Sequence, residues 1–241
     1  EVNMRWASYA LRVPAASPRK PPVRKNARTL LTWATPDFAL AGARIWWQSQ
    51  LVTASLAPGF LVAAPSMRCP FFNHTLVLLI DHGDEGSFGF VINRMTDLGL
   101  GDVFNEVGVK GEAADSVDAP VLLGGPVSPE SGWILYDAEG VPQPSTGKTI
   151  AVGDRISCSA SVEILERIAR GDGPETCAMM LGYSGWGAGQ LEDEMKQGSW
   201  IPVDLDYSLV FDTPIDLRWE AALATLGIDP ARVIDNQIAS A

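Results

Sequence analysis

Short hydrophobic runs are concentrated between residues 60 and 93, and they predict β-strands. Residues 75–80 read Thr-Leu-Val-Leu-Leu-Ile, a continuous aliphatic and β-branched run that suits a strand buried on both faces. Residues 82–86 have the composition of a turn, and residues 88–93 form a second apolar run, so we expect a hairpin over 75–93. Further strands are expected at 60–65, 120–123, 132–136, 149–152, 176–182 and 207–212.

Apolar residues at helical spacing mark three other segments. Residues 162–170 have this spacing, with serines before them that can cap a helix and Gly171 after them that can end it. Residues 190–197 predict a short helix, because the acidic side chains come first and a lysine comes last, as the helix dipole prefers. A third helix is expected between Pro214 and Gly227. Hairpins interspersed with a few helices indicate an α+β fold rather than alternating βαβ units.

The charge of the chain is distributed unevenly. Residues 1–50 hold eight Lys or Arg against Glu1 and Asp37, which gives +6, so the total of −11 leaves −17 on residues 51–241. A body of that charge repels a phosphate backbone, and no basic cluster follows residue 50, so we expect no direct DNA binding by the body. No apolar run reaches the roughly 18 residues of a membrane helix, so we also expect no membrane partner.

The first fifty residues differ from the rest in composition as well as in charge. Residues 14–25 contain four prolines and four cations without hydrophobic periodicity, which is typical of a disordered or extended segment. Three interpretations stay open: a translated upstream region, an Arg-rich organelle-targeting leader, or an arm that binds an acidic partner. We therefore divide the chain into a leader, residues 1–50, and a folded domain, residues 51–241.

The three cysteines are too few for a disulfide scaffold, and free thiols in a reducing cytosol are the simplest interpretation. Cys69, His74 and His82 are separated by four and then seven residues, which matches no standard zinc pattern. We therefore expect no metal site and no cofactor.

Two segments resemble catalytic motifs but lack a required residue. Gly147-Lys148-Thr149 has the ending of a phosphate-binding loop, yet Pro142 stands where that motif needs glycine, so we expect a turn into a strand. Gly182-Tyr183-Ser184-Gly185-Trp186 has tryptophan where a nucleophile elbow needs its second glycine, so Ser184 is expected in a turn. No catalytic set is assigned, and an enzyme remains an alternative with these candidate polar groups: His82, Asp84, Glu85, Glu192 and Glu194.

The run from Leu181 to Met195 is the most distinctive stretch, with four glycines, two large aromatic residues and an acidic helix start. Together with residues 60–94, 123–135 and 210–229, it resembles the AlgH/YqgE family of bacterial proteins. The resemblance implies a single compact α+β domain with a coiled, bifurcated mixed sheet and flanking helices, located in the cytoplasm. Members are described as transcriptional regulators without an established enzyme activity. The chain departs from the family pattern at three positions: Cys69, Ser131 and Tyr136.

Three hypotheses for function follow. The first is an indirect transcriptional regulator, and the second is a module that binds a small ligand or a protein partner. In the second, two glycine-rich segments bring backbone N–H groups to one concavity with aromatic walls. Its candidate residues are His82, Asn93, Gly124, Gly125, Pro126, Tyr183, Trp186, Gln190 and Glu192. The simpler alternative is that the glycines allow bends in the sheet while the aromatic residues fill the core. The third hypothesis is the enzyme named above.

Overall fold

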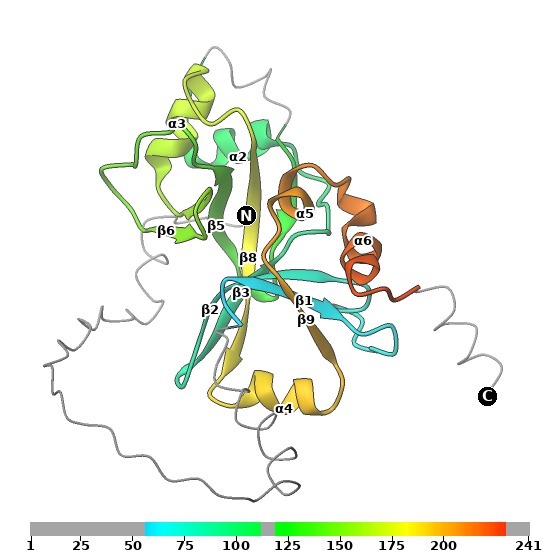
Figure 1. Ribbon diagram of the computed structural model, residues 1–241. Coiled ribbons are helices and arrows are strands. Elements are labelled where there is room, and N and C mark those ends of the chain that lie inside the picture. Colours follow the sequence, from blue (N-terminus) through cyan, green and yellow to red (C-terminus); the bar gives the residue numbers. More distant parts are fainter. Residues whose placement is uncertain (1–55, 112–118, 230–241) are drawn as a thin grey trace, which may run out of the picture. The chain divides into compact units, whose positions relative to one another are not determined.

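The computed structural model describes residues 56–111 and 119–229, so the predicted leader, residues 1–50, lies outside the described part of the chain. The strands are β1 (Gly59–Ala63), β2 (Leu76–Gly83), β3 (Gly86–Val91), β4 (Val121–Leu123), β5 (Val127–Asp137), β6 (Thr149–Val152), β7 (Ile156–Ser159), β8 (Cys177–Gly187) and β9 (Trp200–Asp204). The helices are α2 (Leu100–Val107), α3 (Val162–Arg170), α4 (Gln190–Lys196), α5 (Tyr207–Phe211), the 3₁₀ turn η1 (Ile215–Leu217) and α6 (Arg218–Thr225). The structure confirms an α+β fold with flanking helices (Figure 1).

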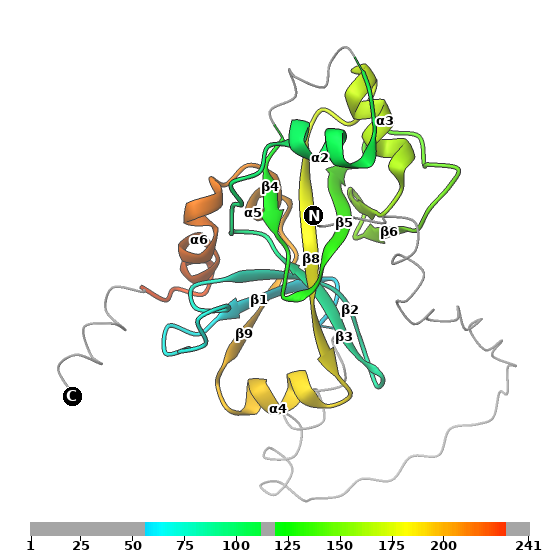
Figure 2. The same ribbon diagram turned by 180° about the vertical axis from the view of Figure 1, so that it is seen from behind.

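Strand β8 joins the two parts of the sheet. The strand order is β6-β7-β5-β8-β3-β2-β1-β9, neighbours along this order are antiparallel, and β4 pairs with β8 in parallel. The first half of β8 pairs with β4 and β5, whereas residues 184–187 pair with β3. The sheet therefore divides at β8, with α2 and α3 beside one part and α4 at the far end of the other (Figures 1 and 2).

Each part of the sheet has its own hydrophobic core. One core combines the apolar faces of α2 and α3 with β4, β5 and β8, and Phe104, Ile134 and Leu165 are fully buried in it. The other core lies over β1, β2, β3 and β9, where Leu191 of α4 packs with Trp186 and Trp200. Helix α4 thus belongs to the second core, which places its polar side chains at the edge of that core.

Several sequence-based predictions are confirmed. The hairpin over 75–93 is β2 and β3, and the runs at 60–65, 120–123 and 149–152 are β1, β4 and β6. Helix α3 begins at the N-cap Ser161, whose side chain accepts a hydrogen bond from the Glu163 N–H, and it ends at Gly171. These elements agree with the sequence because local capping residues and apolar periodicity both favour them.

The prediction of a strand at 207–212 is wrong, because residues 207–211 form the short helix α5. Asp206 caps this helix by accepting a hydrogen bond from the Ser208 N–H, and the aromatic Tyr207 packs under Arg155. Three elements were not predicted: α2, β7 and β9. Strands β7 and β9 are four and five residues long, which leaves too few positions for a clear period.

The glycine-rich run after Leu181 is a strand as far as Gly187, which corrects the expectation of a turn. Ser184 lies inside β8, is fully buried, and donates a hydrogen bond to the Gly124 carbonyl oxygen. A Cβ atom on Gly125 would lie 2.0 Å from the Tyr183 carbonyl carbon and 2.3 Å from the Ser184 N atom. The glycines are therefore needed because two backbone segments cross in contact, and a turn follows only at 188–189.

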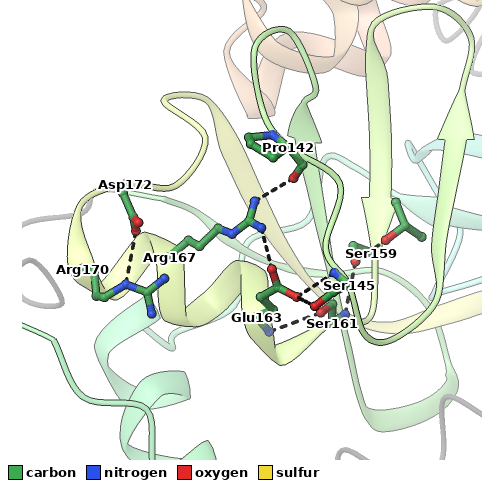
Figure 3. A network of polar contacts seen from close by, with 9 residues as sticks. Pro142, Ser145, Ser159, Ser161, Glu163, Arg167, Arg170 and Asp172 are labelled. Carbon is green, nitrogen blue, oxygen red and sulfur yellow. Dashed lines mark hydrogen bonds and ion pairs between the residues drawn. The ribbon is translucent and has the colours of Figure 1, made fainter.

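The loop that contains Gly147-Lys148-Thr149 packs on α3. Glu163 accepts hydrogen bonds from the N–H and the hydroxyl of Ser145, and Arg167 donates to Glu163 and to the Pro142 carbonyl oxygen (Figure 3). A Cβ atom on Gly147 would lie 2.8 Å from the Cα atom of Ser161, so this glycine touches the start of α3. The segment is thus a packed loop that enters β6, in agreement with the rejection of a phosphate-binding loop.

Helix α6 is fastened to the sheet by two buried side chains. Arg218 donates hydrogen bonds to the carbonyl oxygens of Ile92 and Thr213, and the Trp219 indole N–H donates to the Ala63 carbonyl oxygen. Burial lowers the pKa of Arg218 to about 10, so the guanidinium remains charged at neutral pH. A charged group can stay buried here because it replaces water with two backbone acceptors.

Candidate functional site

A groove of about 580 Å³ lies beside α4, within the range of about 300–1,000 Å³ that is usual for small-molecule sites. Four segments line it: the loop residues 66–72, Pro126, the end of β8, and the chain from Gln190 to Trp200. The described residues that line it include three aromatic rings, two sulfur-containing side chains, one carboxylate and one guanidinium. These side chains come from distant parts of the sequence, and the fold brings them together by pairing β9 with β1 and β3 with β8.

Three rings form the wall of the groove. The ring centroids of Phe72 and Trp186 are 6.3 Å apart in a stacked arrangement, and Trp200 meets both rings edge to face at 5.3 and 5.7 Å. Phe72 is half-buried, while both tryptophans are at least nine-tenths buried. This wall is therefore packed into the second core and keeps a fixed shape.

Glu194 is the polar centre of this wall. One carboxylate oxygen, Oε2, accepts hydrogen bonds from the indole N–H groups of Trp186 at 3.0 Å and Trp200 at 2.7 Å. The other, Oε1, accepts a hydrogen bond from the Gln190 side-chain amide at 2.8 Å. Buried indole N–H groups need an acceptor, and a single carboxylate serves both of them. Glu194 therefore orients both indoles and holds α4 against β8 and β9.

The start of α4 is set by the turn after β8. Gly189, the N-cap residue, has φ +73°, a left-handed conformation that glycine adopts without a steric penalty. The Gln190 side chain then reaches back, and its Oε1 accepts a hydrogen bond from the Gly187 N–H at 3.1 Å. Gln190 thus links the end of β8 to Glu194, and the first turn of α4 is fixed relative to the aromatic wall.

The rim of the groove carries Arg68 and Cys69, both exposed. Within the described residues, 56–111 and 119–229, Arg68 makes no hydrogen bond or ion pair. Cys158 is buried and Cys177 is half-buried, and this burial raises the pKa of Cys158 and raises that of Cys177 to about 11. Cys69 is therefore the thiol best placed to report on events in the groove.

The groove contains three of the nine candidate residues named from the sequence: Pro126, Trp186 and Gln190. Gly124 and Gly125 lie next to it, but they face the backbone of residues 182–184 and leave no room for a ligand between the two segments. The backbone N–H of Gly124 donates to the Leu181 carbonyl oxygen, so this N–H is already used. The glycine pair thus acts as a packing contact that positions Pro126.

Two further candidates, His82 and Glu192, meet each other outside the groove lining. His82 Nδ1 lies 2.8 Å from the Ser87 hydroxyl oxygen, and His82 Nε2 lies 3.7 Å from a Glu192 carboxylate oxygen. The order of serine, histidine and carboxylate is that of a hydrolase triad, but Ser87 is buried in β3. The pocket lined by Glu194 does not include any of these three residues. The contact therefore joins α4 to the β2–β3 hairpin.

The remaining candidates have structural contacts elsewhere. Asn93 accepts a hydrogen bond from the Leu76 N–H and donates one to the His74 carbonyl oxygen, which fixes the start of β2. Tyr183 packs edge to face on Phe88 at 5.2 Å, in a ring cluster that also contains Trp133. Asp84 and Glu85, named for the enzyme alternative, are exposed at the hairpin turn.

Within residues 56–111 and 119–229, no three His, Cys, Asp or Glu side chains are grouped so that they could hold a metal ion. The imidazole of His74 instead packs edge to face on Trp219 at 4.3 Å. In the same part of the chain, no helix is long and apolar enough to cross a membrane.

Sequence reasoning missed much of the groove. Phe72 and Trp200 were not selected, and Glu194 was named only for the enzyme alternative. A signal for Glu194 did exist, because an acidic residue eight positions after one tryptophan and six before another can accept from both indoles. Of the positions that depart from the family pattern, Cys69 lines the groove, whereas Ser131 and Tyr136 are buried in β5.

Comparison with known proteins identifies the family to which this chain is similar. The model of the AlgH-like family matches residues 60–231. A "UPF0301 protein" of Anaeromyxobacter dehalogenans strain 2CP-C is 43% identical over 182 residues, which cover 74% of this chain and 91% of that protein. A "UPF0301 protein" of Paraburkholderia phymatum is 42% identical over 174 residues, which cover 72% and 90%. The matched part includes every segment that lines the groove.

Solved structures give the same result. The solution structure of the AlgH protein from Pseudomonas aeruginosa is 33% identical and matches with a TM-score of 0.62, over 75% of this chain and 94% of that one. A crystal structure of a Corynebacterium diphtheriae protein, 21% identical with a TM-score of 0.51, shares the fold. The matches cover the described sheet and its helices, and the chain belongs to the AlgH-like family, whose function is uncharacterised.

Proposed function

We propose that this protein is a binding module, and that the groove beside α4 holds a small organic ligand. The observation that carries the proposal is the fixed wall of Phe72, Trp186 and Trp200 around the carboxylate of Glu194. Rigid aromatic walls with a few oriented polar groups are typical of ligand sites, because little conformational freedom is lost on binding.

We propose further that any role in transcription is indirect. The body carries −17, so contact with the phosphate backbone of DNA is electrostatically unfavourable. A ligand in the groove instead contacts α4, and α4 contacts both β8 and β9, so binding can be read by a protein partner at this end of the sheet. A cytoplasmic location belongs to the same proposal, since three free cysteines suit a reducing compartment.

The enzyme alternative has less support. His82 contacts both Ser87 and Glu192, but Ser87 is buried and none of the three residues lines the groove beside α4. Glu194 lies in the groove, yet its carboxylate is engaged by three N–H donors that orient it. A general base has to accept the proton that it removes, and the oxygens of Glu194 already accept hydrogen bonds from two indoles and Gln190.

The test is a thermal-shift screen of the full chain against a library of metabolites. A ligand present at 100 times its Kd adds about 2.7 kcal/mol to the free energy of unfolding, which is enough to raise the melting temperature measurably. Hits are expected to change tryptophan emission, because Trp186 and Trp200 line the groove. A library without a single stabilising compound would count against a ligand-binding function.

A further inference from the structure

Two charges of opposite sign lie in the groove, and they differ in their exposure to water. Glu194 lines the groove beside the aromatic wall and is half-buried, whereas Arg68 is exposed at the rim. Water and salt screen an exposed charge far more than a partly buried one. The carboxylate therefore has the larger effect on a ligand inside the groove.

The aromatic wall favours the same sign of charge. The N–H edges of Trp186 and Trp200 both point to Glu194, so the hydrogen-bond donors of these rings are already used. What the rings can still offer a ligand is apolar contact and their π-electrons, which attract a cation and not an anion. The third ring, Phe72, has no polar atom and adds to this preference.

The net negative charge of residues 51–241 also favours a cationic ligand. Residues 51–241 carry −17, and Glu192 and Asp193 precede Glu194 on α4. A strongly negative surface raises the local concentration of small cations and lowers that of anions. Arg68 opposes this trend only at the rim.

We infer that the ligand of the groove is a small organic cation, with an ammonium or guanidinium group on a flat or aromatic body. The cationic group lies beside Glu194, and the body packs against Phe72 and the two indoles. This inference rests on the proposed function, and it names the chemical class of the ligand for the same groove. The alternative is that Glu194 serves only to orient the indoles.

Three probes that share one ring separate these possibilities: 2-phenylethylammonium, 3-phenylpropionate and 2-phenylethanol. Each is titrated into the full chain at constant ionic strength, with tryptophan emission and the alkylation rate of Cys69 by iodoacetamide as readouts. The ammonium probe is expected to bind about fivefold more tightly than the alcohol, and the carboxylate probe more weakly than both. Equal or tighter binding of the carboxylate or the alcohol would overturn the inference.

Two variants separate charge from structure. Glu194→Gln keeps the size of the side chain and an acceptor oxygen but removes the charge, so the affinity for the ammonium probe should fall about fivefold, to that of the alcohol. Affinity for the alcohol itself should stay within about twofold, which shows that the groove is intact. Arg68→Gln removes the opposing charge from the rim, so it should raise the affinity for the ammonium probe.

Unchanged ammonium binding in Glu194→Gln, or its loss in Arg68→Gln, would contradict the inference. So would a library hit that protects Cys69 and carries no cationic group, although that hit would support the proposed function. If the three probes and every library hit leave Cys69 alkylation unchanged, the proposed function itself fails together with the inference.

Discussion

Replacement of Gly125 by alanine tests whether the glycine pair before Pro126 is a packing contact. The added Cβ would lie 2.0 and 2.1 Å from the carbonyl carbon and oxygen of Tyr183, and 2.3 Å from the N atom of Ser184. All three are backbone atoms in the middle of β8, so no side-chain rotation can relieve the overlap. The two segments therefore have to separate, and this separation also weakens the pairing of β4 with β8.

The expected cost is at the upper end of what overpacking produces, about 3 kcal/mol of the free energy of unfolding. For a domain of this size, 1 kcal/mol corresponds to about 2–4 °C, so the melting temperature should fall by about 6–12 °C. Calorimetry of the full chain measures the fall directly. Gly101→Ala is the matched control, because nothing lies within 4 Å of its Cβ position in α2, and alanine should add about 0.5–1 kcal/mol there.

A Gly125→Ala protein as stable as the wild type would refute this reasoning. It would mean that the two backbone segments are not in contact in solution, and that the glycine pair is available to a ligand. A loss of ligand binding without a loss of stability would lead to the same conclusion.

Three further outcomes are expected. Arg218→Met should lower the free energy of unfolding by about 3 kcal/mol, because two charge-assisted hydrogen bonds are lost; a change below about 0.5 kcal/mol in urea unfolding would contradict the buried clamp. The hydrogen bond from Arg155 lowers the pKa of Asp137, so the stabilisation is present above the unfolded pKa near 3.9 and disappears as pH falls through the lower folded value. In Asp137→Asn, the free energy of unfolding should therefore fall less steeply with decreasing pH below about pH 4. An unchanged pH dependence in this range would argue against that ion pair. In the native full chain, iodoacetamide should modify Cys69 well before Cys158, as peptide mass spectrometry can show; equal rates would contradict the burial of Cys158.

Elements with local signals could be predicted from the sequence. The N-cap Ser161 and the stop at Gly171 define α3 within a residue, and the apolar run at 75–80 identifies β2. These signals act between neighbours in the chain, so a single sequence contains them.

Elements that depend on distant partners could not be predicted in this way. Residues 207–211 contain aromatic and aliphatic residues that favour a strand, but they form a helix in which Tyr207 packs against Arg155 from the turn between β6 and β7. The glycines of β8 favour a turn by composition, but this segment is a strand whose backbone at Tyr183 and Ser184 lies against Gly125. Tertiary contact overrides local preference at both places.

The candidate site shows the same division. Trp186 and Gln190 lie in the distinctive run and were found, whereas Phe72 and Trp200 reach the groove only through the pairing of β1 with β9 and the loop before β2. His82 and Glu192 were placed in one site, and they do contact each other, but at the hairpin and not in the groove.

We propose that the groove beside α4 is the functional site of this protein. The most direct measurement is the alkylation rate of Cys69 in the full chain, with and without the strongest stabilising compound from the library. We predict that the compound slows this reaction about fivefold in the native chain and has no effect after denaturation, because Cys69 lines the groove. A compound that raises the melting temperature but leaves the rate unchanged would place the binding site elsewhere and contradict the claim.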